Sequence, residues 1–593
     1  MNDLASAVAS TVRPGLPTRV DMLSFWLRSR VHILLRAASN LGDHSHRRWR
    51  RRDALAAAAV VAESRTPLWD DGRDDEFTLV AGKVHNLRVA VRAFDGVVVP
   101  AGATLGFWRQ LGRPSARRGF VRGRELRAGC IVPVVAGGLC QLSNALAEVA
   151  VRSGLAFVER HAHSARVGDG SIDATVFWNY VDLRLSASHA WRLEAELTAR
   201  ELVVRVRADV PARALTPAAM PPRSRGLPGT LRGCYTCEEV ACFRHDPSLR
   251  GAHAREAWLL DGWTPEFETH LAARGDASGI DRYASPTAAQ WRRPWRMLPN
   301  TWAGAHALRA ASLRRIVWLR WNAHAQGRRQ SAIVDGERWL AVAFARCLRP
   351  EHDRLVVAQG VLPHLHRLGV LGGRSYRVLA NALPMAEVER RLDAARRGAS
   401  EAAAATLADF RVDAALRESE AIALHAADMI VTAHADVARY WRERGVKVQQ
   451  LRWSMPAVAA RAALADRPGR PLVVFAASAL ARKGAHELAS ALRGLPVRLR
   501  VLGSRSSDTS LWHGVEVEHA GYASDWLGRA RVVVLPAHVE HAPRALLRAI
   551  AAGVPVIATS ACGIDEMPGL QLVPAGDVDA LRTAVTAAVA EAG

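Results

Sequence analysis

The chain has 593 residues, which is enough for about three to four domains of ordinary size. It carries a formal net charge of +23 at pH 7, and 49% of its residues are hydrophobic, so sizeable cores can form and wholesale disorder is excluded. The positive charge is almost wholly arginine, because lysine occurs only at positions 83, 447 and 483. No nucleic-acid recognition motif accompanies this charge, so it does not by itself predict nucleic-acid binding.

The seven cysteines are too few for a disulfide framework at this length, and three of them cluster, which favours a reducing compartment. No stretch reaches the roughly 18 consecutive apolar residues of a membrane span, and no signal peptide is recognisable. We therefore expect a cytoplasmic protein.

Residues 1–75 form a basic N-terminal segment. The run from Met22 to Ala38 places apolar and basic residues at helical spacing, and the basic sequence HRRWRRR follows it. Such a helix can lie peripherally on an anionic membrane surface. The alternative is that its apolar face packs on the next domain and the arginines are simply solvated. Residues 66–76 are polar and acidic and indicate a linker.

Residues 76–208 contain a cysteine at the expected start of a helix. Short alternating runs at 77–80 and 97–99 predict strands, and AGGLCQLSNALAEVAVRSG (136–154) predicts two turn glycines followed by a helix. Cys140 would begin that helix, where the positive end of the helix dipole lowers a thiol pKa and favours thiolate.

Candidate partners for this cysteine follow in the chain. His161 and His163 come after a strand-like run, and Asp182 lies in ATVFWNYVDLRL (174–185), which alternates as a strand. A nucleophilic cysteine, a histidine base and an orienting carboxylate occur in this order in cysteine enzymes. The alternative is a buried structural cysteine beside two surface histidines.

The same region resembles the VanW family. The resemblance rests on GATLGFWRQLGRPSARRGFVRGRELRAG, GGLCQLSNALAEVAVRSGLAFVERHAHS and ATVFWNYVDLRL, and it covers residues 83–185. It implies an α+β domain at 76–208 of the shorter, intracellular kind, and no settled biochemical activity comes with the family name.

A proline- and arginine-rich linker at 209–230 leads to a cysteine-rich segment at 231–252. Cys234, Cys237, Cys242 and His245 have the spacing C-x2-C-x4-C-x2-H. Three thiolates and an imidazole fit a closed structural zinc site. An iron–sulfur cluster with a fourth ligand from elsewhere is the competing metal, and a reduced loop without metal is the third interpretation.

The remaining chain alternates strands and helices, which is typical of parallel α/β sheets. We expect one Rossmann-like half at 253–458 and a second at 459–593. The predicted fold is therefore multidomain α/β, with an α+β domain followed by two doubly wound halves. Two such halves make the GT-B architecture, which many nucleotide-sugar glycosyltransferases use.

The stretch RVVVLPAHVEHAPRALLRAIAAGVPVIAT (531–559) predicts a strand at 532–535, a helix at 542–552 and a strand at 554–558. Gly553 would end the helix with a positive φ. Glu540 falls at the junction of loop and helix, where free N–H groups bind phosphate in open α/β sheets.

The second half resembles glycosyltransferase family 4. Lys483 and Gly484 match its KG element, Glu540 matches its first glutamate, and residues 553–556 match its G-x-P-V element. The resemblance implies that Lys483 neutralises the donor diphosphate and that Glu540 lies by the donor sugar. It also implies that the helix start from Ala542 to Arg544 offers N–H groups to phosphate.

Two positions depart from the family pattern. Ser478 stands where an arginine usually pairs with the lysine, and Arg548 stands where the second glutamate is expected. The first change removes a bidentate phosphate contact, and the second removes an acceptor for ribose hydroxyls. The donor site is weakened or re-specified, and one hypothesis is that Arg548 reaches the phosphates instead.

Two functions from different classes follow. The first is a glycosyltransferase that moves sugar from a nucleotide-sugar donor to a cell-envelope or secondary-metabolite acceptor. The second is a catalytically degenerate GT-B binding or scaffold module, in which the VanW domain acts through Cys140 or in an antibiotic or envelope stress response. Binding and hydrolysis of nucleotide sugars separate the two.

Overall fold

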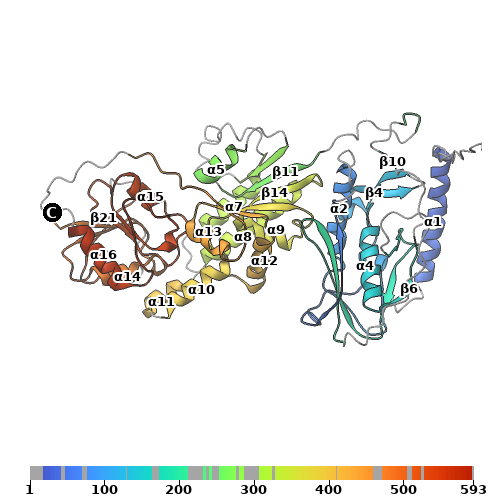
Figure 1. Ribbon diagram of the computed structural model, residues 1–593, viewed down its shortest axis with the longest axis horizontal. Helices are drawn as coiled ribbons and strands as arrows, with labels where there is room; N and C mark the ends of the chain where they lie inside the picture. The colour runs from blue at the N-terminus through green and yellow to red at the C-terminus, as the bar shows by residue number, and fades with distance from the viewer. Residues whose placement is uncertain are drawn as a thin grey trace, which may run out of the picture. The chain divides into compact units, whose positions relative to one another are not determined.

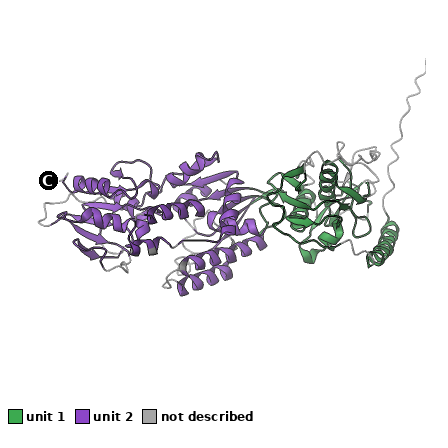
Figure 2. Cartoon of the chain, turned by 90° about the horizontal axis from the view of Figure 1, so that it is seen from below, with its two compact units in different colours: residues 1–256, 348–354, 369–375 green, residues 257–347, 355–368, 376–593 purple. Residues whose placement is uncertain are grey.

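The computed structural model divides into two compact units. Unit 1 comprises Met1–Glu256, Leu348–Arg354 and Gly369–Ser375, and unit 2 comprises Ala257–Cys347, Leu355–Leu368 and Tyr376–Gly593 (Figure 2). The residues described are 18–41, 47–69, 77–127, 130–162, 172–210, 232–234, 239–242, 253–262, 264–274, 279–285, 306–322, 328–397, 399–408, 410–458, 470–503, 510–521 and 526–590.

Unit 1 is an α+β structure in which antiparallel pairing predominates. Its strands join in the orders β1-β9-β8-β2, β10-β5-β4 and β3-β7-β6. The strands are β1 (Val60–Pro67), β2 (Val97–Val99), β3 (Thr104–Gly106), β4 (Arg122–Arg127), β5 (Cys130–Val135), β6 (Ala156–Glu159), β7 (Arg184–Ser186), β8 (Trp191–Leu197), β9 (Glu201–Arg207) and β10 (Arg232–Gly233).

Two helices of unit 1 pack on these strands. Helix α2 (Phe77–Val91) contacts β4 and β8, and α4 (Cys140–Arg152) contacts β1 and β9 (Figure 1). Leucines and valines from α2, α4, β8 and β9 belong to one buried cluster. The other helices are α1 (Arg19–Leu41) and α3 (Phe107–Leu111), with a 3-10 turn η2 (Ala116–Arg118).

Two strand predictions in this region are wrong. Residues 77–80 begin α2, because apolar residues continue to Val84, Leu87 and Val91 at helical spacing and outweigh a four-residue alternation. Residues 174–185 form no continuous strand, because a turn at 178–180 separates Phe177 from Val181, which pair only as an isolated bridge.

The first half of unit 2 is built on a seven-stranded sheet with the order β13-β12-β11-β14-β15-β16-β17. Its strands are β11 (Arg255–Leu260), β12 (Ile280–Ala284), β13 (His306–Ala307), β14 (His352–Ala358), β15 (Ser375–Leu379), β16 (Met429–Thr432) and β17 (Val448–Gln450). Its helices are α5 (Pro265–Ala272), α7 (Arg309–Trp321), α8 (Arg328–Cys347), α9 (Leu362–Arg367), α10 (Met385–Arg396), α11 (Glu401–Leu407), α12 (Ala414–His425) and α13 (Ala435–Arg442), with a 3-10 turn η6 (Gln359–Val361).

The second half is a six-stranded parallel sheet with the order β20-β19-β18-β21-β22-β23. Its strands are β18 (Leu472–Phe475), β19 (Arg498–Val501), β20 (Glu516–His519), β21 (Val532–Leu535), β22 (Val556–Ala558) and β23 (Leu570–Leu572). Its helices are α14 (Ala485–Leu492), α15 (Arg544–Ala551) and α16 (Val578–Ala590), with the 3-10 turns η7 (Ala481–Lys483) and η8 (Ser560–Cys562).

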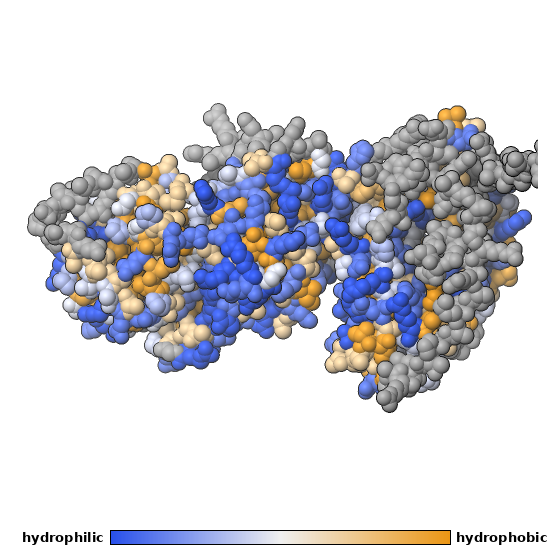
Figure 3. Space-filling view, viewed as in Figure 1, coloured by the Kyte–Doolittle hydropathy of each residue, from blue (hydrophilic) through white to orange (hydrophobic). Residues whose placement is uncertain are grey.

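Helices cover both sides of this second sheet. Helices α14 and α16 contact each other, and α15 lies on the other side of β21 (Figure 1). The central strands β18 and β21 are apolar on both faces, since all four residues of each are buried. On the face drawn in Figure 3, hydrophobic residues appear as patches among hydrophilic ones. An α+β domain followed by two Rossmann-like halves is therefore confirmed.

Candidate functional site

A cavity of about 400 Å³ opens at the carboxyl ends of two neighbouring strands, β18 and β21. After β18 the chain pairs to one side, with β19 and β20, and it then returns to the other side with β21. This reversal is the topological switch point at which open α/β sheets bind their ligands. The cavity is lined by Ala476, Ala477, Ser478, Leu480, Arg482, Lys483, Leu535, Glu540, Ala542, Pro543, Arg544, Ala545, Leu546 and Arg548.

An ion pair between Lys483 and Glu540 spans this cavity. The Nζ of Lys483 lies 2.7 Å from Oε2 of Glu540, and both side chains are 12% exposed. Burial acts to raise the pKa of Glu540, but the charge and hydrogen bond of Lys483 outweigh it and leave that pKa below its ordinary value. Burial lowers the pKa of Lys483. Glu540 is therefore ionised at neutral pH, and its carboxylate stands beside the ammonium expected to bind phosphate.

The amino end of α15 faces the same cavity. Its N-cap residue is Pro543, and no side chain caps this end of the helix. The N–H of Ala542 donates to Oε1 of Glu540 at 2.9 Å, and the N–H of Arg544 donates to the carbonyl of Ala542 at 2.7 Å. Glu540 thus holds, with its two oxygens, both Lys483 and one of the amides that the sequence assigned to phosphate.

The side chain of Arg544 is held by the first half of unit 2. It donates to both carboxylate oxygens of Glu266 on α5, at 2.7 and 2.6 Å, and its guanidinium lies 5.2 Å from the ring centre of Trp453. Glu266 also accepts from the N–H of Ser454 at 2.8 Å. Glu266 and Arg544 are 278 positions apart in the chain. Arg544 therefore helps to shape the cavity wall with a partner that lies far away in the sequence.

The two positions that depart from the family pattern also line the cavity. A Cβ atom added to Gly503 would lie 2.4 Å from the N and Oγ of Ser478, so the loop after β19 packs tightly against this serine. The guanidinium of Arg548 lies 5.7 Å from the ring centre of the buried Trp526. Arg548 thus stands at the cavity with its side chain supported by an aromatic ring.

One cation in the lining was missed in the sequence. Arg482 precedes Lys483 in η7, lines the cavity, and places its guanidinium 4.6 Å from the ring centre of Phe410. The only available signal was its position next to the KG element. With Lys483, Arg544 and Arg548 it gives the lining four cationic side chains, of which Lys483 pairs with Glu540 and Arg544 with Glu266. The four cations outnumber these two carboxylates, and this balance favours an anion as the ligand.

Gly484 is required by both conformation and space. It has φ +78°, and a Cβ atom at this position would lie 2.1 Å from the carbonyl oxygen of Pro536. A side chain here would push the turn η7 away from the end of β21. The glycine therefore lets Lys483 approach Glu540 closely.

A buried histidine supports Glu540 from the first half of unit 2. His434 follows β16 and donates from Nε2 to the main-chain carbonyl of Glu540 at 2.7 Å, while its Nδ1 accepts from the N–H of Val437 at 3.3 Å. Burial lowers the pKa of His434, so the ring is neutral and the two contacts assign the Nε2–H tautomer. A Cβ atom added to Gly563 would lie 2.1 Å from Nδ1 of His434, so the backbone at Gly563 packs directly against the ring.

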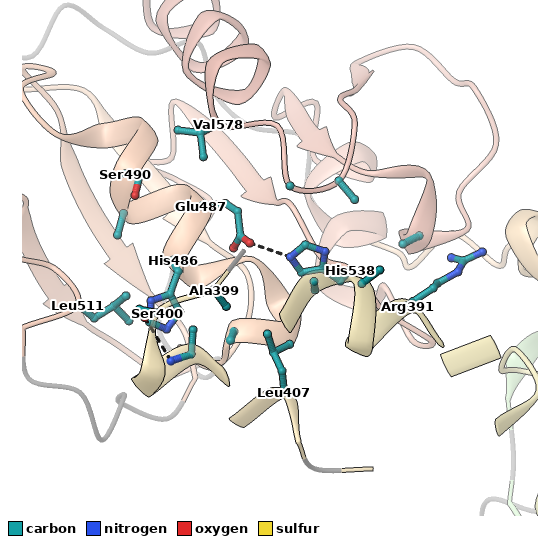
Figure 4. A pocket seen from close by; sticks show the side chains of 18 of the residues that line it. Arg391, Ala399, Ser400, Leu407, His486, Glu487, Ser490, Leu511, His538 and Val578 are labelled. Carbon is teal, nitrogen blue, oxygen red and sulfur yellow. Dashed lines mark hydrogen bonds and ion pairs between the residues drawn. The ribbon is translucent and has the colours of Figure 1, made fainter. Parts of the chain in front are cut away.

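A larger cavity of unit 2, about 1360 Å³, is lined by α10, α11 and residues of the second half (Figure 4). His538 and Glu487 point toward each other there, with Nε2 and Oε1 2.8 Å apart. Arg391 in its lining forms ion pairs with Asp436 and Glu387. The smaller cavity is the better candidate for a phosphate ligand, because it lies at the switch point of the sheet and at the amino end of α15.

In unit 1 the thiol of Cys140 has different partners from those of His161 and Asp182. The thiol of Cys140, the first residue of α4, lies 3.7 Å from Oγ1 of Thr175 and 3.9 Å from the carbonyl of Val176. His161 pairs through Nε2 with Glu159 at 3.1 Å. His163 lies outside the described residues.

Asp182 is 2% exposed and accepts from the N–H groups of Trp108 and Leu183 at 3.1 and 3.0 Å. It also forms an ion pair with Arg184 at 3.2 Å. In the part of unit 1 that is described, no hydrogen bond joins Cys140, a histidine and Asp182. A catalytic role for Cys140 therefore stays a prediction from the sequence.

The structure describes two of the four predicted metal ligands. Cys234 and Cys242 are thiols of intermediate exposure, and Cys237 and His245 lie outside the described residues. Within the described ranges, no group of three or more His, Cys, Asp and Glu side chains is placed to hold a metal ion. Neither zinc nor an iron–sulfur cluster therefore gains support from these residues.

Two family descriptions match separate parts of the chain. Residues 82–207 match the family described as VanW like protein, and residues 470–591 match the family described as Glycosyl transferases group 1. The chain therefore carries a VanW domain in unit 1 and a group 1 glycosyltransferase domain in unit 2. The resemblance to the VanW family is confirmed, and the resemblance of the second half is confirmed at the level of group 1 glycosyltransferases.

Two curated proteins are similar to the VanW region. The Vancomycin B-type resistance protein VanW of Enterococcus faecalis is 25% identical over 133 residues, which are 21% of this chain and 48% of that protein. The uncharacterized protein YoaR of Bacillus subtilis is 31% identical over 102 residues, which are 17% of this chain and 34% of that protein. The chain thus spans less than half of the length of these relatives.

Solved glycosyltransferases are similar to the second unit at low identity. Sucrose-phosphate synthase from Thermosynechococcus elongatus is 16% identical with a TM-score of 0.36, and the match covers 56% of this chain and 89% of that one. Anabaena HepE in complex with UDP and glucose is 12% identical with a TM-score of 0.36, and the match covers 57% of this chain and 90% of that one.

Proposed function

We propose that the protein is a glycosyltransferase that binds a nucleotide-sugar donor in the cavity between β18 and β21. The observation that carries the proposal is the set of four cations around an uncapped helix end at a topological switch point. The match to group 1 glycosyltransferases covers this cavity and supports the assignment.

In the proposed reaction the bond between the sugar carbon and the diphosphate oxygen breaks, the oxygen of an acceptor hydroxyl forms a new bond to that carbon, and the hydroxyl proton is released to solvent. Negative charge grows on the leaving phosphate. Lys483 and Arg482 lie where they could stabilise that charge, together with N–H groups in the first turn of α15. Glu540 would then exchange its contact with Lys483 for one with the donor sugar.

The acceptor is proposed to be a cell-envelope or secondary-metabolite compound. Support for an envelope acceptor comes from the VanW domain on the same chain, whose curated relative carries the name of a vancomycin resistance protein. The alternative is a GT-B module that binds a nucleotide sugar without transferring it, with any chemistry left to Cys140. The departures at Ser478 and Arg548 are the observations that favour this alternative.

The test is calorimetric titration of the full chain with a panel of nucleoside diphosphates and nucleotide sugars, followed by a donor-hydrolysis assay. We expect binding of at least one donor and its loss in Lys483→Ala. Lys447→Ala is the matched control, since Lys447 is an exposed lysine outside the cavity. A chain that binds no donor refutes the proposed function, and binding without any hydrolysis or transfer favours the non-catalytic module.

A further inference from the structure

The first helix, α1, contacts the rest of unit 1 along one side and leaves a row of apolar side chains exposed on the opposite side. Its inward contacts run along one stripe. The rings of Phe25 and Phe177 pack edge to face with their centres 5.8 Å apart. The Oγ of Ser29 lies 3.4 Å from the hydroxyl of Tyr180, and the ring of His32 stacks on the ring of Tyr180 with their centres 5.1 Å apart. Farther along this stripe Arg36 forms an ion pair with Glu159, and Asn40 accepts from Arg184 at 2.7 Å.

The opposite side of α1 is an exposed apolar stripe. Leu23, Leu27 and Leu34 each lie about 200° around the helix axis from a residue of the inward stripe two positions later, namely Phe25, Ser29 and Arg36. The exposed fractions of the residues in the apolar stripe run from 51% to 82%, and no residue of α1 is buried. The members of this stripe are Val20, Leu23, Leu27, Val31, Leu34, Leu35 and Leu41.

Basic and aromatic residues border the apolar stripe. Arg28 lies on one flank, and Arg19 and Arg30 lie on the other, as the helical spacing requires. Trp26 is 51% exposed beside the second flank, with the guanidinium of Arg30 5.0 Å from its ring centre. The same combination of an apolar centre, arginine flanks and a border tryptophan suits the boundary between lipid tails and phosphate headgroups.

We propose that α1 is a membrane-surface helix that lays its apolar stripe on an anionic lipid bilayer. A water-exposed stripe of seven large apolar residues is the reverse of what a surface helix of a soluble protein presents. The helix has 23 residues and is about 34 Å long, so the whole stripe can enter a flat interface at once. The proposal is independent of the proposed sugar transfer.

The geometry favours lying on the bilayer over crossing it. Five charged residues are spread along α1, and a helix of this kind binds in the plane of the interface. None of the helices in the described part of the chain combines the length and hydropathy that crossing a bilayer takes. The contacts of Ser29, His32 and Arg36 keep the inward side on unit 1 while the outward side meets lipid.

The flanking charge favours lipid over a second copy of the chain. Two copies that met through this stripe would bring like-charged arginine flanks together, whereas lipid phosphates would neutralise them. The formal net charge of +23 would also attract the whole protein to an anionic surface.

The test is co-sedimentation of the full chain with vesicles of phosphatidylcholine, with and without phosphatidylglycerol. We expect binding to the anionic vesicles and a decrease at high salt, because screening weakens the arginine contacts. Leu27→Glu and Leu34→Glu should each lower the partition coefficient by at least about tenfold, since each removes one inserted leucine. Gln571→Glu adds the same charge at an exposed position outside α1 and should bind nearly as well as the wild type.

Three results would overturn the proposal. The first is a wild-type chain that does not sediment with anionic vesicles. The second is equal vesicle binding by the wild type, Leu27→Glu and Leu34→Glu. The third is a lipid-free dimer in sedimentation velocity that Leu34→Glu dissociates, because the stripe would then hold a second copy. Thermal unfolding should be unchanged in the leucine variants, since both side chains are exposed, and this keeps their loss of binding interpretable.

Discussion

Replacing Glu540 by glutamine tests the proposed donor site, because the reasoning predicts the direction in which the affinity for a nucleoside diphosphate changes. The variant keeps the shape of the side chain and an acceptor for the N–H of Ala542, but it removes the negative charge that now faces Lys483. We expect Glu540→Gln to bind a nucleoside diphosphate more tightly than the wild type and to transfer sugar more slowly. Lys483→Ala should weaken binding of the same diphosphate.

The magnitude follows from the geometry of the ion pair. A phosphate oxygen in contact with Lys483 would stand roughly 3 to 6 Å from the carboxylate of Glu540, because the two side chains are 2.7 Å apart. Two like charges about 6 Å apart repel by about 3 kcal/mol at an effective dielectric constant of about 20. Rearrangement of Glu540 toward the sugar relieves part of this repulsion. A gain of about 1 to 3 kcal/mol, or roughly 5- to 150-fold in Kd, is therefore expected for Glu540→Gln.

The assay is calorimetric titration of the wild type, Glu540→Gln and Lys483→Ala with the diphosphate of the donor identified by the panel. Glu566→Gln is the matched control, because Glu566 is exposed and lies outside the cavity lining. For Lys483→Ala, loss of a charge-assisted contact predicts a weakening of about 1.5 to 3 kcal/mol.

A decrease of diphosphate affinity in Glu540→Gln would refute this reasoning. It would mean that Glu540 organises Lys483 for phosphate and does not compete with it. Unchanged affinity in both Glu540→Gln and Lys483→Ala would place the phosphate elsewhere. Tighter diphosphate binding together with unchanged sugar transfer would remove Glu540 from the reaction.

Four further predictions concern stability, conformation, metal and thiol chemistry. The partners of Glu266 hold its pKa below the ordinary 4.5 despite burial. Its contribution to stability is therefore present above about pH 4.5 and is lost as the pH falls through the lowered pKa. The melting temperature should accordingly depend less on pH in Glu266→Gln than in the wild type. Gly484→Ala should lower the free energy of unfolding in chemical denaturation by more than about 2 kcal/mol, because it adds a clash to the strain of a positive φ. Gly494→Ala, at φ +75° with nothing within 4 Å, should lower it by about 1 kcal/mol. Equal losses in the two variants would contradict the close approach of Gly484 to Pro536. If the cysteine-rich segment binds zinc, elemental analysis should find less metal in Cys237→Ser than in the wild type, and unchanged metal content would exclude these ligands. If Cys140 is an activated nucleophile, its labelling rate should titrate below the free-thiol value of about 8.5, and a midpoint at that value would argue for a structural thiol.

The second half was predictable because its signals are local. The strand from Val532 to Leu535 is a continuous apolar run, and the helix that follows it repeats apolar residues at helical spacing. Gly553 has φ +74° just after the end of α15, as a C-terminal glycine requires. Such patterns depend on neighbours within a few positions, so a single sequence contains them.

The contacts around the cavity were not predictable in the same way. Glu266 reaches Arg544 across 278 positions, and His434 reaches the carbonyl of Glu540 across 106. Neither residue stands in a motif, and a buried glutamate on an amphipathic helix has no periodic signature. The wrong strand prediction at residues 77–80 has a local cause, since a window of four residues was too short to separate a helix from a strand.

Through these long-range contacts the proposed donor cavity depends on both halves of unit 2, although its lining comes from the second half alone. Glu540 is contacted through its main chain by His434, and Arg544 is held through its side chain by Glu266. Both anchors come from the first half and both act at the loop before α15, the segment whose N–H groups are proposed to receive phosphate. Any movement of the first half relative to this loop would therefore change the placement of Glu540 against Lys483 and, with it, the charge that a diphosphate meets.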